Sequence, residues 1–245
     1  MSSKTFGNGG PARTSVFYEE NMIEIVSKTK DYVIIYKPAG IPSQSDLGGD
    51  PDAMTLCSAM LKDMGENDGL FLIHRLDRVV GGLIVFARNK TTAAKLSSLV
   101  ADREFGKYYY SVVSGKADGG ELVDYLYKDA SLGKSFVTDR KRAGVKEAQL
   151  QYELLDFAEI DGKEYSLVKI RLKTGRFHQI RCQFASRKMP LIGDKKYGSR
   201  DFKAKMPALF ATEISFMINE KEVTAKRLPD LTEYPWSLFA EEKYR

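Results

Sequence analysis

The chain has 245 residues, 43% of them hydrophobic and 29% charged, which is an ordinary globular composition and allows one large domain. No apolar run approaches the ~18 residues that a membrane helix needs, so a membrane-spanning class is excluded and no membrane partner is expected. Its two cysteines and two histidines have no metal-ligand spacing, so we expect no structural metal site, and free thiols indicate a reducing, cytoplasmic compartment.

The net charge of +5 is distributed unevenly along the chain. The segment 169–200 has ten basic residues and a single acid, Asp194, which gives this segment +9 and leaves −4 for the remainder. A basic stripe on a mildly acidic protein is typical of a polyanion-binding surface, although a solvated basic face has the same composition. Because the stripe contains one of the motifs described below, we favour nucleic acid as the partner.

The pattern of apolar, glycine and proline residues predicts strands and helices in an irregular order. The polar residues 1–15 are expected to form a flexible tail, and residues 16–245 a single domain. In chain order the predicted elements are a hairpin (23–28 and 32–36), a loop (37–42), a helix (52–64), a strand (83–87), a helix (91–100), a strand (108–113), a mobile loop or ribbon (134–146), two strands (149–157 and 166–172), a short helix (178–187), a turn region (191–197), a strand (209–216) and a C-terminal tail packed across the domain. This mixture indicates an α+β fold with a mixed sheet.

The motif His74-Arg75-Leu76-Asp77-Arg78 places one carboxylate between two guanidinium groups, shortly before Gly81-Gly82 and an apolar strand. Asp77 is therefore the candidate nucleophile or general base. Burial would raise its pKa and an arginine would lower it, with Arg75, Arg78 and Arg181 as possible counterions. The alternative is a structural Asp–Arg pair that ties a loop to the sheet, and spacing alone does not decide between the two.

The second motif is Thr174-Gly175-Arg176-Phe177-His178-Gln179-Ile180-Arg181, in which a strand turns at a glycine into a helix. The amide donors at the start of that helix are expected to be exposed and to offer a phosphate site. His178 and Arg181 lie three residues apart and should project together, while Ile180 and Phe184 anchor the adjoining face in the core. For His178, a hydrogen-bonded structural role is favoured over proton transfer.

Three consecutive tyrosines, Tyr108, Tyr109 and Tyr110, begin one of the predicted strands. Alternation sends Tyr109 to one face of the sheet and its two neighbours to the other. A tyrosine over a pocket can stack on an extruded base, although half-buried packing is the commoner role of such residues.

Taken in order, these motifs resemble those of the RluA-type RNA pseudouridine synthases. The resemblance covers segments 36–42, 74–88, 107–115, 174–181 and 190–198. It implies the pseudouridine synthase catalytic fold, an α+β fold with a mixed, mostly antiparallel central sheet flanked by helices and loops. It further implies an enzyme that flips uridines out of structured RNA, rRNA or tRNA, and isomerises them to pseudouridine with no metal or cofactor.

The same resemblance assigns roles to individual residues. Asp77 is expected to be the catalytic aspartate, attacking the sugar or the base, with Tyr109 as the base-stacking, proton-handling tyrosine and Arg181 as the arginine paired with the aspartate. Arg75 is expected to fill the space that the flipped uridine leaves. The further candidates for substrate binding are Arg78, Lys107, Arg176, His178 and Ile192.

The sequence departs from the family pattern beside the pocket. Val79-Val80-Gly81 replaces a polar segment, and Phe177 and Gln183 replace a common threonine and histidine, which affects RNA contacts more than chemistry. Only about twenty residues precede the first predicted strand, so we expect no N-terminal S4 RNA-binding domain. The catalytic domain is then expected to recognise RNA unaided, as a monomer without an obligate protein partner.

Two other functions are compatible with parts of the sequence. A noncatalytic RNA-binding protein could retain the fold, but the trio of Asp77, Tyr109 and Arg181 is intact. An unrelated hydrolase could use Asp77 as its nucleophile, but no second acid or base stands beside it in the motif.

Overall fold

The computed structural model describes residues 23–45, 49–140 and 142–244, and the tail predicted over residues 1–15 lies outside them. The strands are β1 (Glu24–Lys28), β2 (Tyr32–Lys37), β3 (Phe71–Leu72), β4 (Gly81–Ala87), β5 (Gly106–Ser114), β6 (Gly120–Asp129), β7 (Lys134–Val137), β8 (Val145–Ile160), β9 (Lys163–Leu172), β10 (Leu209–Ile218) and β11 (Lys221–Lys226). The helices are α1 (Ala53–Asp63), α2 (Lys90–Ala101) and α3 (Gln179–Ser186), with short 3₁₀ segments η1 (Lys195–Tyr197), η2 (Trp236–Leu238) and η3 (Glu241–Lys243).

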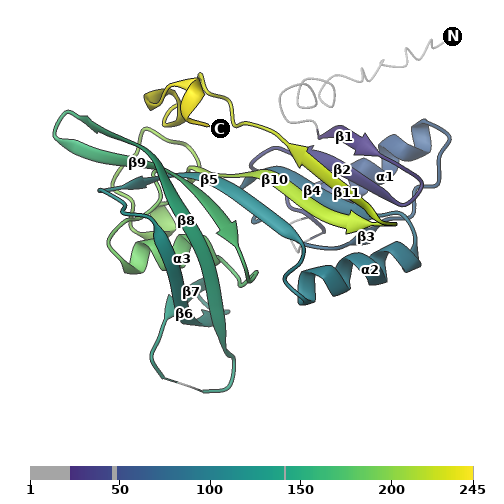
Figure 1. Ribbon diagram of the computed structural model, residues 1–245, viewed down its shortest axis with the longest axis horizontal. Helices are drawn as coiled ribbons and strands as arrows, with labels where there is room; N and C mark the ends of the chain where they lie inside the picture. Colours follow the sequence, from purple (N-terminus) through teal and green to yellow (C-terminus); the bar gives the residue numbers. More distant parts are fainter. Residues whose placement is uncertain (1–22, 46–48, 141, 245) are drawn as a thin grey trace, which may run out of the picture.

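The strands form one continuous sheet in the order β1-β2-β4-β10-β5-β9-β8-β6-β7, with β11 added beside β10 and β3 beside β4 (Figure 1). Among these strands the β4–β10 pair is parallel, and the other pairs are antiparallel. The expected α+β fold with a mixed, mostly antiparallel sheet is therefore confirmed. The predicted first hairpin is also present as β1 and β2.

The central strand β4 follows directly from its sequence. All seven of its residues are buried, as its run of Leu, Ile, Val and Phe predicts. Its start requires glycine, because Gly82 has a φ of +126° and a Cβ there would lie 2.3 Å from the Ala211 carbonyl oxygen. This close approach of β4 to β10 fixes the end of the loop that carries Asp77.

The helices cover both faces of the sheet. Val33 and Ile35 of β2 share a hydrophobic cluster with residues of α1 and α3, whereas the intervening Ile34 shares a second cluster with Leu96 of α2. Because side chains alternate along a strand, α1 and α2 lie on opposite faces. None of the helices in the described ranges is long and apolar enough to cross a membrane.

The segment 134–146, predicted as a mobile loop or ribbon, is ribbon at its two ends, and the described residues between 137 and 145 lie outside the strands. Its first residues form β7, which pairs with β6, and β6 pairs in turn with β8 (Figure 1). The sequence pattern did not predict β6, β11 or the two-residue β3. In β6 and β11 the buried positions are few and lie among charged residues, so apolar alternation is weak.

The C-terminal segment packs across the domain, as predicted. Trp236, Phe239 and Tyr244 share a hydrophobic cluster with Tyr110 and Val112 of β5. The Tyr110 hydroxyl donates a hydrogen bond of 2.7 Å to the Tyr244 carbonyl oxygen. The tail therefore covers the face of β5 that points away from the cavity described below.

Candidate active site

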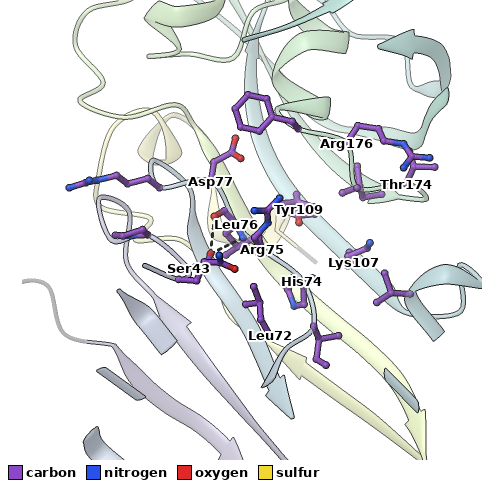
Figure 2. A pocket seen from close by; sticks show the side chains of 18 of the residues that line it. Ser43, Leu72, His74, Arg75, Leu76, Asp77, Lys107, Tyr109, Thr174 and Arg176 are labelled. Atoms are coloured by element: carbon purple, nitrogen blue, oxygen red, sulfur yellow. Dashed lines mark hydrogen bonds between the residues drawn. The ribbon is translucent and has the colours of Figure 1, made fainter. Parts of the chain in front are cut away.

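A cavity of about 930 Å³ opens beside the loop that joins β3 to β4 (Figure 2). Asp77 is the one acid among the described residues that line this outer cavity. The cavity is otherwise strongly basic, with a lining that includes Arg75, Arg78, Arg103, Lys107, Lys128, Lys173 and Arg176. The basic segment 169–200 supplies only two of these side chains, so it is not by itself the polyanion surface. Cations from four other parts of the chain complete that surface.

A second, inner cavity of about 80 Å³ continues from the outer one. The two cavities share Arg75, Asp77 and Tyr109 in their walls. The inner walls are mixed: Val80, Leu172, Ile180 and Leu209 supply apolar surface, and the polar side chains include those of His178, Gln179 and Arg181. Asp77 thus lies where a wide, basic cavity meets a narrow one of mixed polarity.

Asp77 is half-buried and pairs with one of its three possible counterions. Its Oδ2 lies 3.2 Å from Nη1 of Arg181. The guanidinium of Arg78 instead donates to the carbonyl of Gly40 at 2.9 Å and to the carboxylate of Asp50 at 2.5 Å. Burial raises the pKa of Asp77 and Arg181 lowers it only in part, so the pKa stays above the ordinary aspartate value.

Arg181 is held by a second carboxylate, that of Asp194. Its Nε donates to Asp194 Oδ2 at 2.6 Å and its Nη2 to Oδ1 at 2.9 Å, a bidentate geometry that leaves Nη1 for Asp77. Both Arg181 and Asp194 are buried. The sequence analysis did not assign Asp194 to the site, although its position as the single acid in a basic stripe was a usable signal.

The start of α3 differs from the prediction of an exposed phosphate site. Gln179, Ile180 and Arg181 are buried and line the inner cavity. The Gln179 side chain accepts hydrogen bonds from Thr174 Oγ1 at 2.8 Å and from the Arg176 amide at 3.0 Å, which closes this end of the helix. The prediction of an exposed helix start was wrong because the first residues of α3 are buried in the protein interior. Anchoring by Ile180 is confirmed.

Tyr109 has the orientation that strand alternation predicts. It lines both cavities, whereas Tyr110 joins the hydrophobic cluster on the opposite face of β5. Burial, and to a lesser degree the charge of Asp77, raise the pKa of the Tyr109 hydroxyl well above its usual value. The hydroxyl therefore keeps its proton at neutral pH and can donate it in a hydrogen bond.

Lys37 is a site residue that the sequence analysis missed. Its ammonium is fully buried at the end of β2 and donates to the carbonyls of Pro38 at 3.0 Å and Ile41 at 2.7 Å. A third carbonyl, that of Arg78, lies 3.5 Å away, so Lys37 ties loop 37–42 to the loop carrying Asp77. Burial lowers the pKa of Lys37 to about 7, against the opposing effect of Asp77.

Three of the predicted substrate-binding residues lie in the outer cavity with their polar groups available. Figure 2 shows Lys107 and Arg176 along the wall opposite Asp77 and Arg75. Lys107 is 7% exposed, and its ammonium finds no acceptor among the described residues. Arg176 donates through Nε to the Glu147 carbonyl at 2.7 Å. Arg75 is exposed and pairs with no carboxylate in the described part of the chain.

Ile192 is not brought to either of these cavities. It packs instead with Tyr110 and Val112 on the opposite face of β5, and its amide donates to the Val112 carbonyl at 2.9 Å. The expectation that it lines the substrate pocket is not met, because the backbone pairing with β5 turns its side chain to the far face of the sheet. The apolar wall is supplied by Val80, Leu172 and Leu209.

A sequence model of the RNA pseudouridylate synthase family matches residues 31–186, which is more than half of the chain. The chain belongs to this family. The resemblance to the RluA-type synthases is thereby confirmed, and with it the enzyme class, an RNA pseudouridine synthase and hence an isomerase.

Individual relatives agree with this assignment. An uncharacterised RNA pseudouridine synthase of Aquifex aeolicus is 33% identical over 77% of this chain, and the chain spans 60% of the length of that relative. A tRNA pseudouridine synthase C of Vibrio cholerae is 29% identical over 80% of this chain and 86% of its own. A ribosomal large subunit pseudouridine synthase D of Borreliella burgdorferi is 26% identical over 87% of this chain and 65% of its own.

The fold has close counterparts among solved structures. Human RNA pseudouridylate synthase domain containing 1 superposes with a TM-score of 0.71 at 18% identity, covering 88% of this chain and 86% of that chain. Human RNA pseudouridylate synthase domain containing 4 superposes with a TM-score of 0.69 at 22% identity, covering 84% of this chain and 89% of that chain. At these identities the likeness concerns the fold alone.

Proposed function

We propose that this protein isomerises uridine in structured RNA to pseudouridine, with Asp77 as the nucleophile and the target uridine turned out of its strand. The observation that carries the proposal is the position of the Asp77 carboxylate, paired with Arg181, at the junction of the basic outer cavity and the narrow inner cavity. Phosphates would lie in the first and the uracil in the second. Relatives named for tRNA and for the ribosomal large subunit support these two RNA classes as substrates.

Extrusion of the uridine has a cost that the outer cavity is suited to offset. Unpairing and unstacking one nucleotide costs a few kcal/mol, less in a loop. Phosphate contacts from Lys107, Arg78 and Arg176 would recover that free energy, and Tyr109 would stack on the extruded base. Arg75, which is exposed, lines the outer cavity and pairs with no described carboxylate, would occupy the space left in the RNA.

The surroundings of Asp77 suggest which oxygen reacts. Oδ2 faces Arg181 and His178, whereas Oδ1 accepts no hydrogen bond from any described residue. Oδ1 is therefore the proposed attacking atom, with the sugar C1′ and the uracil ring as the two possible targets. In the overall reaction the N1–C1′ bond breaks, the uracil turns and a C5–C1′ bond forms. C5 loses a proton and N1 gains one, so no oxidant or reductant is required.

Arg181 supports this role by keeping Asp77 ionised. A neutral aspartic acid cannot attack carbon, and burial alone would favour the neutral form. The guanidinium compensates only partly, which leaves a carboxylate that is charged yet poorly solvated, and such a carboxylate is a better nucleophile than one in bulk water. The free, buried thiols of Cys57 and Cys182 support a reducing compartment, and we propose the cytoplasm.

The decisive experiment measures tritium release from RNA labelled at uracil C5. We expect release by the wild-type protein and a loss of roughly 10⁴-fold or more in Asp77→Asn, because the amide cannot act as the nucleophile. Asp156→Asn is the matched control, since Asp156 is a remote carboxylate on β8 that pairs with Lys243, and it should keep the wild-type rate. Normal release by Asp77→Asn would refute the nucleophile assignment.

The same variant has a predicted effect on stability. The pKa of Asp77 is raised in the folded protein, so the folded state binds this proton more tightly than the unfolded chain does, and the ionised carboxylate costs stability at pH 7. Asp77→Asn should consequently unfold at an equal or higher temperature while its RNA binding is retained. RNA binding by the wild type without any tritium release would favour the noncatalytic alternative.

A further inference from the structure

His178 lies between the proposed nucleophile and a buried tyrosine. It is the N-cap of α3 and has a left-handed backbone, with φ of +52°. Its Nε2 is 3.6 Å from Asp77 Oδ2, and its Nδ1 is 3.0 Å from the hydroxyl of Tyr197. The ring of Phe177 stacks on the imidazole with a centroid distance of 3.8 Å, which further restricts its rotation.

The hydrogen bonds of Tyr197 determine which nitrogen of His178 carries the proton. The Tyr197 hydroxyl oxygen accepts a hydrogen bond of 2.8 Å from the backbone amide of Ser135 on β7. An amide can only donate, so the hydroxyl proton is left to be donated, and His178 Nδ1 is its acceptor among the described residues. The imidazole proton must then reside on Nε2, the nitrogen that faces Asp77.

The charges around His178 keep the ring neutral. Burial, Arg181, Lys196 and Lys128 all disfavour the imidazolium, and Asp194 opposes them. Asp77 faces the ring from the loop before β4, but it is itself engaged by Arg181. The pKa of His178 is lowered to about 3, so a neutral ring with a single proton persists throughout the physiological range.

We propose that His178 is a positioning residue for Asp77, held by Tyr197 and the Ser135 amide as the neutral Nε2–H tautomer. This inference rests on the proposed function, and it places the His178 Nε2–H group against Asp77 Oδ2, the oxygen that Arg181 also contacts, at 3.6 Å, which is longer than a direct hydrogen bond. A neutral donor orients the carboxylate without adding a positive charge that would make it a weaker nucleophile. His178 then acts on the nucleophile and not on the RNA, which differs from the substrate-binding role expected from sequence.

The hydrogen bond between the Ser135 amide and Tyr197 also connects β7 to the candidate active site. Ser135 supplies the amide to Tyr197, and its hydroxyl donates to the Phe177 carbonyl at 2.6 Å. The Cys182 thiol donates to the Ser135 carbonyl at 3.3 Å. Strand β7 thus contacts both Phe177, the residue before His178, and the Tyr197 hydroxyl, which determines the tautomer of His178.

The second histidine of the chain provides an internal reference with the opposite tautomer. His74 Nε2 accepts a hydrogen bond of 3.3 Å from the Val85 amide, so its proton must lie on Nδ1. Burial, with a smaller effect of Lys107, lowers the pKa of His74 to about 3. Because the chain has only these two histidines, the spectra contain two sets of imidazole signals, and the set that responds to a change at Tyr197 belongs to His178.

Long-range ¹H–¹⁵N spectra of the full-length, ¹⁵N-labelled protein at pH 7 test the tautomers directly. We expect two neutral rings, one with the proton on Nε2 and one with the proton on Nδ1. In Tyr197→Phe the His178 signals should move toward a tautomer mixture while those of His74 stay fixed, which also shows that the variant is folded. A charged His178, an Nδ1–H form in the wild type, or unchanged His178 signals in Tyr197→Phe would overturn the proposal.

Kinetics on the same variant test the functional part. Tyr197→Phe removes the hydrogen bond that fixes the imidazole proton on the nitrogen facing Asp77, so kcat should fall about tenfold while KM for RNA stays unchanged. Tyr244→Phe is the matched control, since it removes another buried tyrosine hydroxyl, one that donates to the Trp236 carbonyl far from the site, and it should keep both constants. An unchanged kcat, or an effect on KM alone, would contradict positioning.

The tautomer measurement needs no activity. An inactive wild-type protein with the expected spectra would therefore count against the proposed function alone, and an active protein with the wrong tautomer would count against this inference alone.

Discussion

At the scale of single residues, the site is organised around one guanidinium shared by two carboxylates. Asp194 takes two of the donors of Arg181 and Asp77 takes one, with distances of 2.6, 2.9 and 3.2 Å. Burial lowers the pKa of Arg181, but the two carboxylates more than compensate, so its charge is permanent. The longer of these contacts is the one to Asp77, the proposed nucleophile, which Arg181 therefore holds less firmly than Asp194.

This arrangement predicts separable effects on stability and activity. Arg181→Met should lower the free energy of unfolding by about 3–5 kcal/mol, because it leaves the buried Asp194 charge unpaired. Arg181→Met combined with Asp194→Asn should recover most of that stability but not tritium release, since Asp77 still lacks its counterion. Urea unfolding and the tritium assay measure the two quantities. Full activity in Arg181→Met would remove the ion pair from the mechanism.

At the scale of elements, the position of the loop that carries Asp77 depends on where β4 begins. The loop carrying Asp77 is fixed on one side by Lys37, which holds loop 37–42 to the Arg78 carbonyl, and on the other by the start of β4 between β2 and β10. Gly82 lies at that start, against the backbone of Ala211. The beginning of the strand is thus part of the site without supplying a side chain to it.

Gly82→Ala should therefore destabilise the protein by about 2–4 kcal/mol and displace the loop. Gly120→Ala is the matched control, because Gly120 has nearly the same backbone φ, +131°, and a methyl group added there would meet nothing within 4 Å among the described residues. Gly120→Ala should lower the free energy of unfolding only by the strain of placing alanine at a positive φ. Urea denaturation of the two variants compares them, and equal losses would show that the contact with Ala211 is unimportant.

At the scale of the whole molecule, the polyanion surface is assembled from distant parts of the chain. The cations around the outer cavity come from β5, β6, the segment after α2, the loop before β4 and the turn before α3. Other basic residues of segment 169–200 make contacts within the protein, outside the outer cavity. Arg187 pairs with Asp124 at 2.9 Å, and Lys196 donates to the Gly133 carbonyl at 2.9 Å.

Salt dependence of RNA binding tests this surface. Each phosphate contact contributes a slope of roughly 0.7–0.9 to the fall of log affinity with log salt, so Lys128→Ala and Lys173→Ala should each reduce the slope by about that amount. Lys226→Ala should leave it unchanged, because Lys226 pairs with Glu213 outside the cavity. Filter binding over a salt series gives the slopes, and equal slopes for all three variants would argue against the cavity as the RNA site.

Much of the fold was predictable because its signals are local. The hairpin of β1 and β2, the buried β4, the helices α1 and α2 and the packed C-terminal segment all follow from apolar periodicity, caps and turn residues. The prediction failed where charged residues hide the alternation, as in β6, and where tertiary contacts cover what the sequence leaves open, as at the start of α3. The predicted division into a tail and one domain stays a prediction.

The sequence by itself determined which residues are the candidates for catalysis, because Asp77, Tyr109 and Arg181 each lie in a motif whose local geometry can be worked out. Only the tertiary structure decided their partners. It selected Arg181 over Arg75 and Arg78 as the counterion, brought Asp194, Tyr197 and Lys37 to the site, and turned Ile192 away from it. The physical reason is that pairing and burial depend on distances between segments remote in the chain, and residue spacing does not contain those distances.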